Sequence, residues 1–242
     1  MREPQATSTL GTFRTTTLVG AALALLCVAT PTTSGAQIRG SAPRAPQYGW
    51  WISGGASAVT LTDITDGASQ TVWRFGKDPL WQYRATIEKA LDEFTTIGVS
   101  AGYGRVNVGI SSVGGLVNAS LPTSCDTGCA ATTELWTGMA QFRSGGGPGF
   151  HTLFEASGGA TVFRGFKTQT DAIAIPGIAR SLDLSGTLGA GFAYALTPGF
   201  VVALVQDFGI GFHAKADLPE GAARTWRVRN TRASIRMSLG GR

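Results

Sequence analysis

The sequence is poor in charge, in basic clusters and in long apolar runs, and each shortage excludes a class of protein. Asp, Glu, Lys and Arg make up 14% of the 242 residues, whereas about 25% is usual in soluble domains. The net charge of +5 comes without a basic cluster or stripe, so we expect no nucleic acid among the partners. After residue 36, no apolar run reaches the roughly 18 residues that a membrane-spanning helix requires.

The first 36 residues have the three parts of a secretory signal. Arg2 and Arg14 give a basic start, and the apolar run Leu18–Ala29 is too short to span a membrane as a helix. The small residues Ser34-Gly35-Ala36 then precede Gln37. We therefore expect export with cleavage after residue 36, and an uncleaved anchor is the alternative.

Two-residue alternation between Ser181 and Leu196 is the clearest structural signal in the chain. Successive side chains of a strand point to opposite sides, so this stretch predicts one long strand with an apolar face and a small, polar face. It is about twice the usual strand length and close to what crosses a bilayer at a tilt. The apolar face carries Leu182, Leu184, Leu188, Ala190, Phe192, Tyr194 and Leu196.

Eight segments of this kind follow one another, and their connections alternate in length. Short links near 92–94, 144–148 and 197–199 alternate with longer ones, as in barrels with short periplasmic turns and long external loops. The segments are Gly49–Leu61, Leu80–Leu91, Thr95–Arg105, Glu134–Arg143, Gly149–Phe163, Ser181–Leu196, Phe200–Phe212 and Thr225–Leu239.

Over Gln47–Leu239 the chain resembles the small eight-stranded outer-membrane β-barrel proteins of the OmpA and OmpX type. The resemblance implies an all-β fold, an eight-stranded antiparallel up-and-down transmembrane barrel in the bacterial outer membrane. It also implies a monomer with membrane lipid, lipopolysaccharide and the barrel assembly machinery as partners. The chain departs from the pattern by ending Leu239-Gly240-Gly241-Arg242 instead of on an aromatic residue. The predicted parts are a signal peptide at 1–36, a flexible lead-in at 37–47 and the barrel domain at 48–242.

The small, polar face decides which side of the barrel looks outward. A water-facing surface is usually rich in charge, whereas Ser, Gly, Thr and Ala suit the narrow lumen of an eight-stranded barrel. We therefore expect the apolar face to meet lipid, with aromatic residues near the segment ends forming interfacial girdles. The alternative is a soluble lipocalin-like carrier, with the apolar face inside and the aromatic residues in its core.

Charges of both signs lie on the predicted inner faces. Buried charges persist when they are paired, so these residues predict an ion-pair network inside the lumen, and the alternative places several of them in water at strand ends. The candidates are Arg84, Glu88, Glu155, Asp183, Asp207, Arg232 and Arg236.

Two cysteines, Cys125 and Cys129, lie in the longest predicted loop. In an exported protein this pair favours a disulfide that restrains the loop. A metal site would need further His or Cys ligands close by, and the sequence offers none. We therefore expect no metal and no cofactor.

His151 and His213 are the only histidines, so any Ser-His mechanism must use one of them. His151 lies four residues before Glu155 on the same side of its strand, but no nucleophile motif accompanies it. We therefore expect a protein that is not an enzyme, with a structural or surface-recognition role through its external loops. The alternatives are a narrow pore for small solutes and a barrel enzyme that modifies lipid A.

Overall fold

The computed structural model describes residues 49–112, 125, 128–175, 178, 180–213 and 224–239. The signal peptide and the lead-in predicted at 1–36 and 37–47 lie outside the described residues. Contacts divide the chain into a unit at 1–45 and a unit at 46–242, and the description below concerns the second. No helix in the described part is long and apolar enough to cross a membrane.

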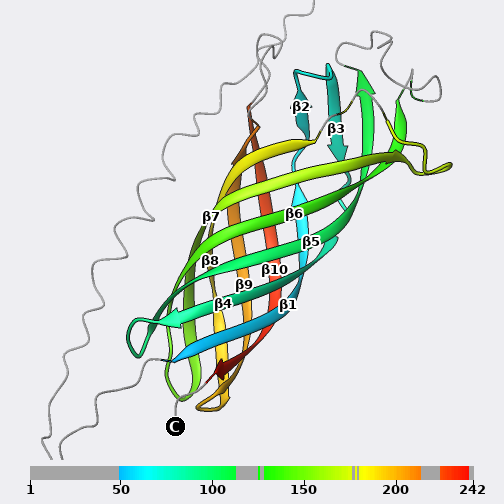
Figure 1. Ribbon diagram of the computed structural model, residues 1–242. Helices are drawn as coiled ribbons and strands as arrows, with labels where there is room; N and C mark the ends of the chain where they lie inside the picture. Colours follow the sequence, from blue (N-terminus) through cyan, green and yellow to red (C-terminus); the bar gives the residue numbers. More distant parts are fainter. Residues whose placement is uncertain are drawn as a thin grey trace, which may run out of the picture. The chain divides into compact units, whose positions relative to one another are not determined.

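Eight long antiparallel strands form a closed barrel (Figure 1). Each long strand pairs with its neighbours in the chain, and the pairing of β5 with β6 and of β1 with β10 completes the circle. The predicted all-β, up-and-down barrel is confirmed. The barrel strands are β1 (Trp50–Leu61), β4 (Leu80–Ala90), β5 (Thr95–Ser112), β6 (Cys129–Ser144), β7 (Gly149–Thr168), β8 (Ser181–Thr197), β9 (Phe200–Phe212) and β10 (Thr225–Leu239).

A short hairpin, β2 (Ile64–Asp66) and β3 (Thr71–Phe75), occupies the connection between β1 and β4. The alternation pattern places none of the eight predicted strands in this connection. Strand β3 pairs with the far end of β5, from Thr71 opposite Ser112 to Phe75 opposite Val108. The hairpin therefore extends the barrel wall at the end opposite to where β10 finishes (Figure 1).

The apolar faces point outward over most of the barrel. On β8, Leu182, Leu184 and Leu188 are 49, 63 and 69% exposed, while the alternate residues Ser181 and Asp183 are buried. Burying that apolar face in lipid is what stabilises such a surface. The orientation contradicts the lipocalin-like alternative, which needs the apolar face inside.

Strand β5 shows where this outward apolar face ends. Up to Tyr103 the outward residues are apolar or small, but from Arg105 none has an apolar side chain, and the inward residues Val106, Val108 and Ile110 are buried. Apolar side chains turn inward where the outer surface meets water instead of lipid. The change at Arg105 therefore marks the outer boundary of the membrane. Strands β5, β6 and β7 are longer than predicted. The predicted ends lie where the apolar residues change from the outward face to the inward face.

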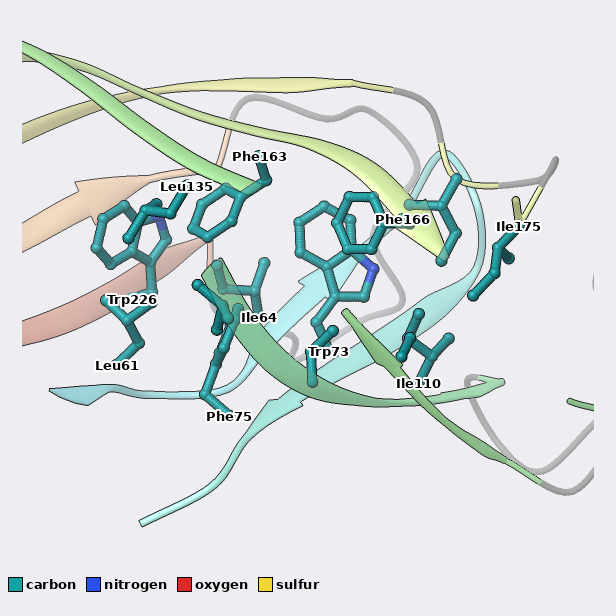
Figure 2. Packing of buried hydrophobic residues seen from close by; sticks show 14 of the residues in the cluster. Leu61, Ile64, Trp73, Phe75, Ile110, Leu135, Phe163, Phe166, Ile175 and Trp226 are labelled. Carbon is teal, nitrogen blue, oxygen red and sulfur yellow. The ribbon is translucent and has the colours of Figure 1, made fainter. Parts of the chain in front are cut away.

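The interior beyond this boundary is filled by a hydrophobic cluster (Figure 2). Trp73 of the hairpin is fully buried, with ring centroids 4.7 Å from Phe166 and 5.8 Å from Phe163. Phe163 also meets Trp226 edge-on at 6.0 Å. The hairpin is thus held in the mouth of the barrel by aromatic packing.

The opposite end of the barrel has tight turns. In the β4–β5 turn, Asp92 accepts hydrogen bonds from the backbone N–H groups of Phe94 (2.8 Å) and Thr95 (2.7 Å). The bond from Phe94 lowers the pKa of Asp92. Gly145, with φ of 127°, donates its N–H to the Phe94 carbonyl at 2.8 Å and links the β6–β7 turn to this one.

Candidate functional site: the filled barrel interior

Arg143 lies at the centre of an ion-pair network inside the membrane-spanning part of the barrel. Its Nη1 is 3.1 Å from Glu88 Oε1, and its Nε is 2.9 Å from Glu155 Oε1. Arg236 Nη2 approaches the other Glu88 oxygen at 2.7 Å. The four strands that supply these groups, β4, β6, β7 and β10, all present them on the inward face, where two-residue alternation places them.

Arg232 continues the network towards β9. It forms an ion pair with Glu155, and its Nε is 3.5 Å from Asp207 Oδ2. Asp207 also accepts a hydrogen bond from the Asn230 amide at 2.9 Å. Arg232 is 1% exposed, and such a charge is tolerated in the interior only when paired and hydrogen-bonded.

Neutral side chains add hydrogen bonds to two of the carboxylates. Thr96 donates to Glu88 at 2.8 Å, and Gln141 donates to Glu155 at 3.2 Å. The network therefore crosses the lumen from β4 and β5 through β6 and β7 to β9 and β10. Arg84 lies close enough to Arg232 to interact with it electrostatically, beside a small interior cavity of about 40 Å³ that it lines.

The structure brings five of the predicted candidates into this network, namely Glu88, Glu155, Asp207, Arg232 and Arg236. Sequence analysis missed Arg143, which shares its strand face with the apolar residues Leu135 and Met139. The apolar residues make that face look lipid-facing. The polar side chains Gln141 and Arg143 at the next alternate positions of this strand are the signal that could have identified it as the inward face.

Asp183 takes part in a separate cluster near the barrel mouth. His213 Nδ1 is 2.9 Å from Asp183 Oδ1, and His213 Nε2 is 3.4 Å from Asp66 Oδ1 in the hairpin. Trp226 Nε1 and Ser181 Oγ donate to the same Asp183 carboxylate at 2.8 and 2.6 Å. The cluster therefore ties β2 to the wall formed by β8, β9 and β10.

His213 is positively charged in this setting. Burial alone would lower its pKa, but the hydrogen bonds to Asp183 and Asp66 outweigh that effect and raise the pKa to about 9. Each ring nitrogen then donates to a carboxylate, so no lone pair remains to take a proton from Ser181, although its Oγ is 3.2 Å from Nδ1. The geometry suits an anchor better than a general base.

His151 has a different environment from the one that an acyl-transfer site needs. Its Nδ1 is 3.1 Å from the carbonyl oxygen of Gly149 on its own strand. The Glu155 carboxylate is engaged by Arg143, Gln141 and Arg232. Among the described residues, no group of three or more His, Cys, Asp or Glu is arranged to hold a metal ion.

Cys125 and Cys129 form a disulfide, as expected for this pair in an exported protein. Cys129 begins β6, and Cys125 is fully buried as a member of the hydrophobic cluster. The disulfide therefore fixes the chain just before β6 to the apolar contents of the barrel mouth.

A closed barrel with an apolar outer band and an ion-paired interior is a transmembrane β-barrel of the bacterial outer-membrane type. No family model and no curated protein sequence matches the chain.

Among solved structures, neisserial surface protein A (NspA) is 11% identical, over 78% of this chain and 97% of that one, with a TM-score of 0.43. Ail, the attachment invasion locus protein of Yersinia pestis, is 10% identical, over 79% and 99%, with a TM-score of 0.43. The outer membrane protein OprG of Pseudomonas aeruginosa is 15% identical, over 81% and 98%, with a TM-score of 0.42.

Proposed function

We propose that this outer-membrane protein is a non-catalytic, non-conducting barrel that acts as a structural or recognition element through its extracellular end. The observation that carries the proposal is the filling of the lumen at two levels. The ion-pair network around Arg143 and Glu155 fills the lumen within the membrane. The packed rings of Trp73 and Phe163 fill it at the extracellular end. An apolar barrier and a fixed salt-bridge network both oppose ion passage.

The extracellular end supports a recognition role because it is a rigid platform. The hairpin is anchored by Trp73 in the hydrophobic cluster and by Asp66 at His213, and the disulfide fixes the chain before β6. Loops on a rigid scaffold are where binding residues concentrate. We propose outer-leaflet lipid and lipopolysaccharide as the surroundings, the barrel assembly machinery as the insertion partner, and a monomer as the working form.

Conductance across a planar bilayer tests the closed lumen. We expect wild-type protein to give no channel steps at either polarity, because the ion pairs and the packed rings keep the lumen closed. A heat-dependent shift on SDS gels verifies beforehand that the sample is folded. Reproducible steps that disappear in the Arg84→Ala variant would instead identify the narrow pore.

Lipid A analysis tests the absence of catalysis. We expect the lipid A mass spectrum of cells overexpressing the wild-type protein, or the His151→Ala or His213→Ala variant, to match that of cells without the protein. A new lipid A species that appears with the wild type and is abolished by either substitution would overturn the non-catalytic proposal.

A further inference from the structure

The barrel wall has a break at the outer boundary of the membrane. Strand β4 pairs with β5 only as far as Gly104, and β3 pairs with β5 from Val108 onward. The three β5 residues between them, 105–107, are paired with β6. On their other side the chain runs through the linker 76–79, which joins β3 to β4.

A pocket of about 770 Å³ lies at this break. We call it the lateral pocket. Its lining includes Trp81 and Tyr83, which face outward and are 63 and 67% exposed, and also Leu61 and Phe75, which belong to the buried cluster in the barrel mouth (Figure 2). The pocket therefore leads from the lipid-facing surface to the apolar interior. Its volume falls within the range of about 300–1,000 Å³ typical of small-molecule sites.

The rim of the lateral pocket combines aromatic rings with positive charge. Trp81 and Tyr83 mark the membrane interface, where such side chains gather. Arg74 and Arg105 line the pocket together with Asp78. Glu134, which lies opposite Arg105 on β6, is engaged by Arg164 at 3.0 Å. The rim therefore suits a ligand with an apolar chain and an anionic head group.

We propose that the lateral pocket binds one acyl chain of an outer-leaflet lipid, with the lipid phosphate held by Arg105. The position of the pocket favours a membrane lipid, because its lining spans the membrane boundary, from the lipid-facing Trp81 and Tyr83 to the polar Arg105. A phosphate beside Arg105 lies at the level where the outward face of β5 changes from apolar to polar, which is the level of lipid head groups. A charge-assisted contact with a guanidinium suits phosphate geometry.

Native mass spectrometry of protein released from lipid vesicles tests the proposal. The vesicles contain dioleoylphosphatidylcholine with a minor share of either dioleoylphosphatidylglycerol or dioleoylglycerol, which carries the same chains without a phosphate. We expect one phosphatidylglycerol retained per wild-type barrel and about tenfold lower occupancy in Arg105→Gln, since a charge-assisted hydrogen bond is lost. Arg229→Gln, an outward arginine on β10 outside the pocket lining, is the control and should retain the lipid as the wild type does.

Filling the pocket gives an independent test. Asn107 and Ala130 line it and are exposed, so Asn107→Trp and Ala130→Trp should block lipid retention without disturbing the barrel, which a heat-shift gel verifies. Retention at the wild-type level in both variants would overturn the acyl-chain site. Equal retention of dioleoylglycerol and phosphatidylglycerol by the wild type would overturn the role of Arg105. Both results leave the conductance test of the closed lumen unaffected.

Discussion

Arg232 and Arg229 lie on the same strand three residues apart, and they face opposite surroundings. Arg232 is buried between Glu155 and Asp207, whereas Arg229 is exposed and lies over the Phe208 ring at 5.8 Å. The alternation of β10 thus separates a buried charge from a surface charge within one element. The pair offers a matched comparison of what burial does to an arginine.

We predict that Arg232→Met lowers the free energy of unfolding by about 3–5 kcal/mol, because it leaves two buried carboxylates short of a partner. Arg229→Met should cost less than about 1 kcal/mol, since it removes one exposed cation–π contact. Urea titrations of both variants in lipid vesicles, monitored by tryptophan fluorescence, measure the difference. Equal losses in the two variants would contradict a cooperative ion-pair network.

His213 makes the barrel mouth sensitive to alkaline pH. Its pKa is raised from 6.5 to about 9 in the folded state, so its stabilising effect is complete below about pH 6.5 and is lost as the pH rises through about 9. We predict that trypsin cleavage at Arg74 in β3, or at Lys77 just after it, becomes faster between pH 7 and pH 9.5. His213→Gln should be cleaved at one rate across this range, after correction for the activity of trypsin. A wild-type rate without pH dependence would show that His213 does not anchor the hairpin.

At the scale of the strand, alternation predicted the eight barrel strands because each is long enough to repeat the pattern several times. The hairpin escaped prediction because β2 and β3 have three and five residues, too few for a periodic signal. Its apolar residues also face inward, opposite to the apolar faces of the membrane segments. The division of the inward charges into two separate clusters was also not predicted, for a related reason. Asp183 has the inward parity of the network, but its partners, His213 and Asp66, come from the end of one strand and from the unpredicted hairpin.

Trp73→Ala separates the stability of the hairpin from that of the barrel. We predict a loss of about 3–5 kcal/mol from truncating a fully buried aromatic residue, confined to the extracellular end. Hydrogen exchange should increase in 64–75 while β8, β9 and β10 keep their protection. Trp81→Ala, at a lipid-facing position, is the control and should leave the hairpin protected. Uniform loss of protection would show that hairpin and barrel unfold as one unit.

On the scale of the whole molecule, the barrel leaves no strand of its membrane part without two neighbours. We predict that unheated protein migrates on SDS gels as a compact band and that boiling converts it to a slower band, because a closed barrel exposes no backbone edge. A chain that migrates identically with and without heating would contradict closure. Cys125→Ser with Cys129→Ser should retain the shift, since Cys129 lies at the extracellular end of the β5–β6 pairing, opposite Ile110, and the pairing in the membrane part does not depend on the disulfide.

The ion-pair network also constrains how the barrel can assemble. Glu88 belongs to β4, Arg143 to β6 and Arg236 to β10, so the final strand of the barrel supplies a partner to one of the first. The β4–β5 hairpin inserted alone would carry Glu88 into hydrocarbon without its partners Arg143 and Arg236, at a cost of several kcal/mol. The strands therefore have to come together before or while they enter the bilayer, and a chain truncated before β10 lacks the arginines that neutralise Glu88 and Glu155.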